Sequence, residues 1–414
     1  MNVSIITPSN DVQFLQEAHD SFKDQDYYEW IILRNGKALE QEIPWFGDER
    51  VKVFDYTEKT DYIGLLKNET CSHVTGDIVL ELDHDDLLMP TTIEKLKKAY
   101  EDPEIGFVYS NCAQFNYPAW TKPNRFNPAV GWQWRDYTYQ DHVLDEIVSF
   151  PATPASVSKI WFAPDHFRSW RKSLYDEIGG HNRGMRVQDD EDLMCRLYMK
   201  TKFYHINECL YLYRITGANS WAQSDKNAEI QNNVIRLYDK YIYQLCERWC
   251  EMNSLLKIDL GGRFNKPDGY LGLDFKGTDV TCDLNERWPF EDNSIGLIRA
   301  HDVFEHLKYK EHTMAECHRV LVPGGYLLTQ TPSALGQGGF QDPRHVSYWV
   351  RNSFLYYINR DQARFIDNTT YKFKAMRLEE PYYPTDWFRQ NGISYVKADL
   401  IKLPSQDTPG RVDI

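Results

Sequence analysis

Short apolar runs alternate with helix-like stretches along the first half of the chain, and this alternation restricts the fold more than any other feature. The runs that read as strands cover residues 3–8, 30–33, 51–54, 77–82 and 105–110, and residues 63–74 show helical spacing. Strands separated by helices are typical of a parallel sheet covered by helices. Residues 111–164 are rich in Pro, Trp and Asn, and we expect them to form a long irregular excursion.

A second α/β series follows a helical stretch at residues 225–252. Its expected strands cover residues 255–260, 270–274, 295–300 and 326–330, and residues 303–321 read as a helix. A length of 414 residues suggests two or three domains. The sequence therefore predicts α/β domains at residues 1–222 and 253–414, joined by a helical linker at residues 223–252.

The composition disfavours several classes of protein. A formal net charge of −14 implies no broad cationic surface, so non-specific nucleic-acid binding is not expected. No apolar stretch is long enough to span a bilayer, and the N-terminus lacks the basic start of a signal peptide. The eight cysteines include no Cys-x-x-Cys pair, which fits free thiols in a reducing compartment. We therefore expect a cytoplasmic protein without a transmembrane segment.

A cluster of acids follows the apolar run that ends at Leu80. Asp83 and Asp85 should reach the carboxyl edge of the sheet, where open α/β folds bind ligands. Two carboxylates one residue apart can share a hard divalent cation, Mn²⁺ or Mg²⁺, and leave positions open for diphosphate oxygens. The alternative is a turn rich in Asp, followed by a helix with Thr91 and Glu94 as its capping box.

Ordered sequence blocks in the first half match a known family in kind and spacing. They are Ser4-Ile5-Ile6-Thr7-Pro8, Ser21-Phe22-Lys23-Asp24-Gln25, Gly64-Leu65-Leu66-Lys67-Asn68, Leu82-Asp83-His84-Asp85-Asp86, Gly179-Gly180-His181-Asn182 with Asp189-Asp190-Glu191-Asp192, and Tyr213-Arg214. Over roughly the first 220 residues the chain resembles the family 2 glycosyltransferases of GT-A fold. The resemblance implies transfer of a sugar from a nucleotide donor to a hydroxyl acceptor, with inversion at the anomeric carbon.

The resemblance also implies roles for individual residues. Asp85 would hold the cation that neutralises the departing diphosphate, and Asp83 would contact the ribose or the cation. Asp190 would be the catalytic base that deprotonates the acceptor hydroxyl, with Asp189 as the alternative. The alternative for Asp189, Asp190 and Asp192 is that their charges compensate the dipole at the N-terminus of a helix. The further donor-site candidates are Thr7, Pro8, Arg34 and Lys67, and the alternative for Lys67 is a solvated helix lysine.

Two positions depart from the family pattern. Arg34 begins the segment Arg34-Asn35-Gly36, where the family usually has an acid facing the nucleobase, so the base of the donor stays open. Thr216 stands where the family often has a histidine that binds the metal. The cation would then be held more weakly, or its coordination would be completed by water.

A stretch dense in polar and aromatic side chains, residues 161–171, is a candidate acceptor site. Trp170 would stack on a sugar, and Asp165 or His166 would bind its hydroxyls. The alternative is a packed loop whose histidine is satisfied by its neighbours.

The second half resembles the class I S-adenosylmethionine-dependent methyltransferases. The blocks that carry this resemblance are Ile258-Asp259-Leu260-Gly261-Gly262, Gly272-Leu273-Asp274, Cys282-Asp283-Leu284, His301-Asp302-Val303-Phe304-Glu305-His306, Arg319-Val320-Leu321-Val322-Pro323-Gly324-Gly325, and Asp342-Pro343-Arg344-His345. The cofactor-site residues that it implies are Asp259, Gly261, Gly262, Asp274, Asp283 and His301. The glycine loop is shorter than the family pattern, so this half is either a methyltransferase or a non-catalytic binding module.

The histidines of the second half raise the question of a metal site. His301, Glu305 and His306 do not have the HExxH or HxxEH spacing, so zinc binding is not expected there. His301 and His345 are instead candidates for the methyl-acceptor pocket. The complete prediction is a metal-dependent inverting glycosyltransferase acting on a glycan or other hydroxyl acceptor, with a second domain that methylates the product.

Overall fold

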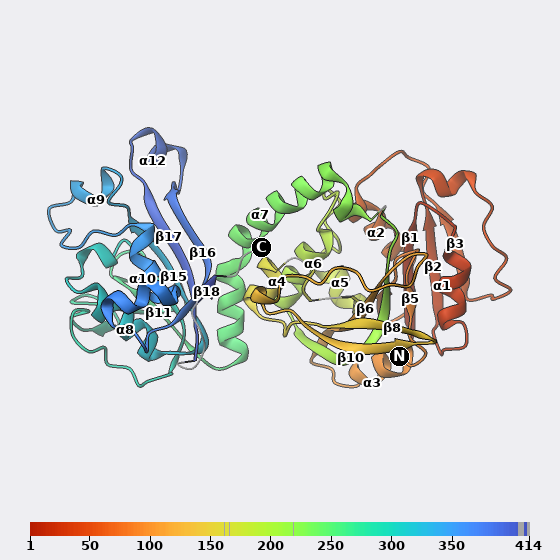
Figure 1. Ribbon diagram of the computed structural model, residues 1–414, viewed down its shortest axis with the longest axis horizontal. Helices are drawn as coiled ribbons and strands as arrows, with labels where there is room; N and C mark the ends of the chain where they lie inside the picture. Colours follow the sequence, from red (N-terminus) through yellow and green to blue (C-terminus); the bar gives the residue numbers. More distant parts are fainter. Residues whose placement is uncertain (161, 165, 218, 405–409, 412–414) are drawn as a thin grey trace. The chain divides into compact units, whose positions relative to one another are not determined.

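The computed structural model describes residues 1–160, 162–164, 166–217, 219–404 and 410–411, shown in Figure 1. The chain forms two compact units, Met1–Leu245 and Cys246–Asp413. The boundary falls inside the long helix α7 (Ser224–Met252), which occupies the segment predicted to be helical. In the described part of the chain no helix is both long and apolar enough to cross a membrane.

The first unit is built on one large mixed sheet. Its strand order is β3-β2-β1-β4-β9-β6-β10-β5, with bounds β1 (Val3–Ser9), β2 (Glu29–Arg34), β3 (Val51–Asp55), β4 (Ile78–Glu81), β5 (Leu87–Leu88), β6 (Ile105–Asn116), β9 (Arg168–Arg171) and β10 (Lys202–Ile215). The first four strands of this order are parallel, and β1, β2 and β4 are buried along nearly their whole length. Strands covered on both faces read as continuous apolar runs, which is why the sequence revealed them.

Strand β9 brings a second segment to the carboxyl edge of β4. It runs antiparallel to both of its neighbours, and Arg168 at its start is paired in register with Glu81 and with Tyr109. The acids that follow β4 therefore meet the residues that precede and begin β9. This arrangement positions the candidate site.

Helices α2 (Ile63–Ser72) and α6 (Asp189–Tyr198) complete the surroundings of that edge. The Gly64 N–H donates to the Met185 carbonyl over 3.0 Å. A Cβ at Gly64 would lie only 2.2 Å from the Asn182 carbonyl oxygen, so the close approach of α2 to the loop before α6 requires glycine. The two helices can thus present Lys67 and Asp189 to each other.

The prediction of an irregular excursion over residues 111–164 was wrong. Strand β6 continues to Asn116, and a hairpin of β7 (Gln133–Tyr139) and β8 (His142–Val148) pairs with it, followed by α4 (Pro154–Lys159). Strand β7 is largely exposed and lacks an apolar run, so hydrophobicity alone does not mark it. Tertiary pairing decides its conformation.

The second unit has its own sheet, in the order β13-β12-β11-β14-β15-β17-β16-β18. The strands are β11 (Leu256–Leu260), β12 (Leu271–Asp274), β13 (Val280–Thr281), β14 (Ile295–His301), β15 (Leu321–Pro332), β16 (Phe373–Tyr382), β17 (Tyr395–Lys402) and β18 (Gly410–Arg411). Strands β11 to β15 are parallel, whereas β17 runs antiparallel to β15 and β16. The predicted strands are present, and β15 is longer than expected.

The predicted helix over residues 303–321 begins later than expected. A short 3₁₀ turn, η4 (Phe304–His306), follows β14, and the helix α8 covers only Lys310–Val320. Between them the chain is extended at Leu307 and Tyr309, and the Asn285 side chain accepts the Lys308 N–H over 2.8 Å. This break separates η4 from α8.

Candidate active site

The acids after β4 have different surroundings. Asp86 is buried and accepts the Tyr211 hydroxyl over 2.8 Å and the Arg214 backbone N–H over 2.7 Å. Its burial, together with the charges of Asp85 and Asp83, raises its pKa well above the usual range. Asp86 therefore anchors the turn to β10, which leaves Asp83 and Asp85 as the acids that can meet a ligand.

Asp83 and Asp85 form the partly open face of this turn. The side chain of Asp83 is 37 % exposed, and its Oδ2 lies 3.7 Å from Nε2 of His166. Partial burial opposes ionisation of Asp83, but the contact with His166 and the nearby Lys67 charge hold its pKa below the usual value. Burial and the negative charge of Asp83 raise the pKa of Asp85. Hard oxygen donors that repel each other in this way fit a divalent cation.

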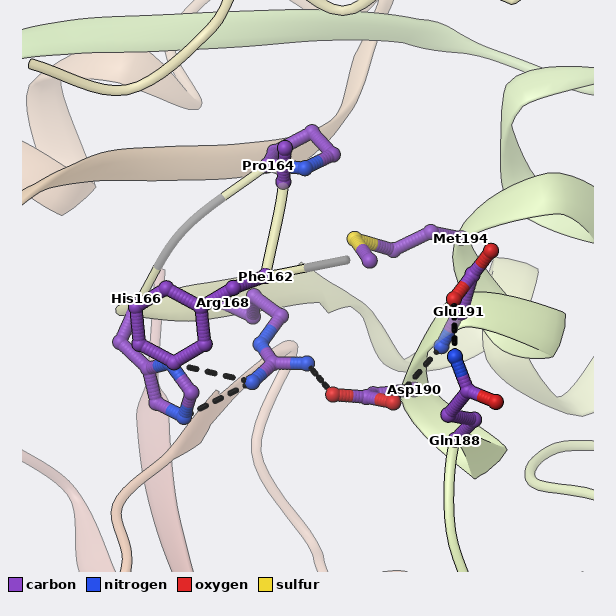
Figure 2. A pocket seen from close by; sticks show the side chains of 9 residues that line it. Phe162, Pro164, His166, Arg168, Gln188, Asp190, Glu191 and Met194 are labelled. Carbon is purple, nitrogen blue, oxygen red and sulfur yellow. Dashed lines mark hydrogen bonds and ion pairs between the residues drawn. The ribbon is translucent and has the colours of Figure 1, made fainter. Parts of the chain in front are cut away.

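A line of polar contacts connects Asp83 to the first turn of α6. Nη2 of Arg168 lies 2.8 Å from Nε2 and 3.1 Å from Nδ1 of His166. Nη1 of Arg168 forms an ion pair with Asp190, as Figure 2 shows. His166 and Arg168 are both buried, so low solvent screening strengthens these contacts.

A small pocket opens beside this line. It is lined by Phe162, Ala163, Pro164, His166, Arg168, Gln188, Asp190, Glu191 and Met194, most of which are labelled in Figure 2. A buried arginine and an accessible aspartate face the same space as aromatic and apolar side chains. Such a lining could orient one hydroxyl of an acceptor.

The two candidate bases differ in access. The side chain of Asp190 is 28 % exposed and lines the pocket, whereas Asp189 is buried. Partial burial would raise the pKa of Asp190, but the Arg168 and Lys67 charges hold it below the usual range. Burial raises the pKa of Asp189 to about 7, against the opposing charge of Lys67. Asp190 is therefore the better placed of the two to accept a proton.

Lys67 does not stand free beside the acids. Its Nζ lies 2.8 Å from Glu81 Oε1 and 3.4 Å from Asp189 Oδ2, and the residue is buried. Burial would lower the pKa of Lys67, yet the Asp189 and Glu81 charges outweigh it and raise the pKa. The ammonium group is committed to these two carboxylates, which argues against a direct contact with phosphate.

The other predicted donor-site residues also have protein partners. The buried Thr7 hydroxyl donates to the Leu82 carbonyl over 2.8 Å and so ties β1 to the end of β4. Pro8 follows it on β1 and is half-buried. Arg34 forms a bidentate ion pair with Asp55, at 2.7 and 2.8 Å. The acid that the family usually has at the end of the second strand is replaced by Arg34, and the acid beside it, Asp55, comes from β3.

The candidate acceptor residues are separated by the structure. Trp170 is 0 % exposed, in the core of the sheet, and it stacks on Tyr175 with ring centroids 5.5 Å apart. The Trp170 ring is not available to stack on a sugar, because it points from β9 into the core. Asp165 lies outside the described residues. His166 lines the pocket, and its role in binding acceptor hydroxyls stays a prediction.

Arg168 and Glu191 belong to the pocket and were not singled out by the sequence. Glu191 is buried, and its Oε2 accepts the Gln188 side-chain amide over 2.6 Å. Burial and the charge of Asp190 raise the pKa of Glu191 to about 8. The sequence does show an arginine-rich strand and an acidic helix start. That these two segments meet could be inferred only once β9 was known to run antiparallel to its neighbours.

In the second unit the predicted glycine loop packs against the protein itself. Gly261 has φ +71°, which favours glycine. A Cβ at Gly262 would lie 2.9 Å from the Asp259 carbonyl oxygen and from the Gly272 Cα. The close approach that requires Gly262 is therefore to strand β12, and it does not depend on a ligand.

Two further candidates of this unit are joined by an arginine. Arg299 NH1 donates to the buried Asp259 over 2.7 Å, and NH2 lies 3.0 Å from Nδ1 of His301. Burial raises the pKa of Asp259, while burial and the Arg299 charge lower the pKa of His301 to about 3. His301 is thus neutral at physiological pH.

Asp274 fits a ribose-binding acid best. It ends β12 at the carboxyl edge and uses Oδ1 to accept the Phe275 N–H over 2.6 Å. A carboxylate at this place in a parallel sheet suits the ribose hydroxyls of an adenosyl cofactor. Asp283 is exposed and accepts from the backbone N–H and the side chain of Asn285, both over 2.9 Å.

Two family models match the sequence. Residues 4–178 match "Glycosyl transferase family 2", and residues 263–329 match "Methyltransferase domain". No curated protein matches the chain.

Several solved structures have some likeness to part of this chain. One is S. aureus TarS 1–349 in complex with UDP-GlcNAc, with 12% identity, 61% of this chain, 73% of that chain and a TM-score of 0.42. Another is the mannosyltransferase PcManGT from Pyrobaculum calidifontis in complex with GDP-Man and Mn²⁺, with 14% identity, 59% of this chain, 68% of that chain and a TM-score of 0.39.

Proposed function

We propose that the chain is a transferase that moves a sugar from a nucleotide donor, because residues 4–178 match the model "Glycosyl transferase family 2" and residues 263–329 match the model "Methyltransferase domain". The acceptor is a glycan or another molecule that offers a hydroxyl group. Transfer depends on Mn²⁺ or Mg²⁺ and inverts the anomeric carbon. The second unit then methylates the product with S-adenosylmethionine.

The observation that carries this proposal is the line of contacts from Asp83 through His166 and Arg168 to Asp190. Displacement of a nucleoside diphosphate needs positive charge on the leaving group and a base near the attacking hydroxyl. The acids after β4 are suited to the first task and Asp190 to the second. The base and the acids lie at opposite ends of the line of contacts. This arrangement suits attack by the acceptor hydroxyl on the face of the anomeric carbon opposite the leaving group.

A bound cation would supply Lewis-acid stabilisation of the departing diphosphate, with Asp85 and Asp83 as its protein ligands. The remaining tasks belong to the protein's own side chains. Arg168 keeps Asp190 ionised, so that the carboxylate can accept a proton from the acceptor hydroxyl. The apolar part of the pocket, Phe162 and Met194, excludes water that would compete with the acceptor.

Donor hydrolysis tests the first reaction. The full-length protein is incubated with common nucleotide sugars, with and without Mn²⁺, and release of the nucleoside diphosphate is measured. We expect metal-dependent release that Asp85→Ala reduces by at least about 100-fold. Asp20→Ala, on the exposed face of α1 (Leu15–Phe22), is the matched control and should behave like the parent. Full activity of Asp85→Ala, or no release from any donor, would refute the assignment.

A non-catalytic second unit is the alternative, and specific contacts favour it. Asp259 is engaged by Arg299, and Gly262 is packed against Gly272. Calorimetry with S-adenosylmethionine separates the two possibilities. Binding that Asp274→Ala abolishes and Asp268→Ala leaves intact would support a methyltransferase, whereas absence of heat in the parent protein would support the binding module.

The location that we propose is the cytoplasm. The eight cysteines all lie in the described part of the chain and form no disulfide there, which suits a reducing compartment.

A further inference from the structure

Three side chains from two separate segments of the second unit converge just beyond the end of β14. Glu305 and His306 lie on η4, and His345 lies in the loop after α9 (Gly338–Gln341). One ligand atom from each of them lies within 4.8 Å of the others. Glu305 Oε1 is 3.9 Å from Nε2 of His306 and 3.9 Å from Nε2 of His345.

Both histidines are oriented by backbone carbonyls on their far side. Nδ1 of His306 lies 3.2 Å from the Arg344 carbonyl oxygen, and Nδ1 of His345 lies 3.0 Å from the Gly339 carbonyl oxygen. A carbonyl can only accept, so Nδ1 carries the proton in each ring. Nε2 is then the lone-pair nitrogen, and in both rings it faces Glu305. Histidines that bind metals are oriented by partners of this kind.

Glu305 is the buried member of the cluster, whereas the two histidines are half-buried. It is 2 % exposed, and its Oε2 is a buried oxygen without a hydrogen-bond partner. A buried carboxylate without a donor is costly, so such groups are normally paired or coordinate a metal. The groups that face it include the acids Asp302 and Asp342, which cannot compensate a negative charge.

The two segments are fixed to each other without any ligand. The backbone N–H groups of Val346 and Ser347 donate to the Glu305 carbonyl over 2.8 and 3.0 Å. The Ser347 hydroxyl donates to the Phe304 carbonyl over 2.9 Å. The three side chains therefore meet on a preformed framework, while the 31 % exposure of the His306 side chain leaves a path from solvent.

We propose that Glu305, His306 and His345 bind a divalent transition metal such as Zn²⁺ and leave at least one coordination position open. Imidazole nitrogen and carboxylate oxygen suit Zn²⁺, and three protein ligands with an open position are typical of catalytic rather than structural zinc sites. The sequence spacing did not predict this site. His301, which was considered as a ligand, contacts Arg299 instead, and the third ligand, His345, is distant along the chain.

The position of the cluster suggests the kind of molecule that would complete the coordination. It follows β14 at the carboxyl edge of the sheet, the edge at which Asp274 ends β12. Ligands of open α/β sheets bind at this edge. The open position would take a hydroxyl or carboxylate oxygen of a small substrate. This metal site does not rest on either of the proposed transfer reactions.

Metal binding is tested directly on the full-length protein. Metal-free Asp85→Ala protein serves as the parent, so that the proposed cation site of the first unit does not contribute. Zn²⁺ is titrated by calorimetry, and Co²⁺ is titrated by visible absorption, whose bands report a site of low coordination number with nitrogen ligands. We expect one equivalent of Zn²⁺ and visible Co²⁺ bands.

Variants assign the site to these residues. His345→Ala and His306→Ala should each weaken Zn²⁺ binding by more than the roughly 10–100-fold that loss of a supporting partner costs. Glu305→Gln, which keeps the side-chain volume, should do the same. His312→Ala is the control, because His312 lies on α8 and its Nε2 contacts the Glu286 carbonyl oxygen instead of the cluster.

The result that overturns the proposal is equally definite. Absence of Zn²⁺ binding in the parent, or unchanged affinity in His345→Ala with native circular dichroism, refutes it. If Glu305→Gln does not fold, the two histidine variants decide the question.

Discussion

Arg168 at the start of β9 is ion-paired with Asp190 in the first turn of α6. The pair has two opposite effects on a catalytic base. It guarantees that the carboxylate is ionised at neutral pH, and it makes the carboxylate a weaker proton acceptor. A charge-assisted hydrogen bond also fixes the carboxylate in the pocket, which favours positioning over basicity.

Arg168→Gln should raise the pKa of Asp190, because the cation that stabilises the ionised form is lost. The acidic limb of the kcat/KM profile should therefore move to higher pH, and the rate at neutral pH should fall by about tenfold or more. The measurement is donor turnover between pH 4 and pH 8. Arg183→Gln, an exposed arginine that contacts Asn68 and Glu69, is the control. An unshifted limb would show that Arg168 does not set the ionisation of the base.

Asp190→Asn and Asp189→Asn should separate the two candidate bases. Asp190→Asn removes the proton acceptor that lines the pocket and should lower kcat by about 10²–10⁴-fold. Asp189→Asn removes one partner of Lys67, whose ammonium keeps Glu81 at 2.8 Å, so kcat should fall by less than about tenfold. Single-turnover transfer assays measure both, and the reverse order would reassign the base to Asp189.

Trp170→Ala should destabilise the protein strongly without a specific effect on the acceptor. Removal of a fully buried indole costs about 3–5 kcal/mol of unfolding free energy. Urea unfolding measures this loss. The milder Trp170→Phe keeps part of the packing, and its KM for the acceptor should equal that of the parent. A large rise in KM for Trp170→Phe would restore Trp170 to the acceptor site.

Glu191→Gln should change how stability depends on pH. The pKa of Glu191 is raised to about 8 in the folded protein. Between its ordinary value of 4.5 and pH 8, the folded state therefore holds a proton that the unfolded state has released. Stability of the parent therefore falls as pH rises from 4.5 to 8. The variant lacks this loss, and at pH 8 it should gain on the order of 3 kcal/mol over the parent. Thermal unfolding at pH 4, 6 and 8 measures the difference, and an equal gain at pH 4 would contradict the ionisation argument.

The elements that sequence could predict are those that are buried on both sides. Strands β1, β2 and β4 have continuous apolar runs, and their ends and the acids after β4 could be located without the structure. Strand β7 is exposed and was missed, because its conformation depends on pairing with β8. The fold class follows from the alternation of strands and helices, which is a local property of the chain.

The site residues were predictable only in part. Asp83 and Asp190 could be named from their motifs, and the structure brings them to one edge through His166 and Arg168. Lys67 could not be judged, because its partners Glu81 and Asp189 come from a different strand and helix. Glu305 and His345 are distant along the chain, so no spacing rule could join them.

The reversed direction of β9 has a consequence for how such a site can diversify. In a purely parallel sheet, every catalytic edge receives only segments that leave a strand. Here one edge also receives a segment that enters a strand. Residues 162–164 and 166–167 can therefore change in sequence while β9 keeps its register with Glu81. Recognition of new acceptors could then evolve on the incoming segment, independently of the donor acids on the outgoing one.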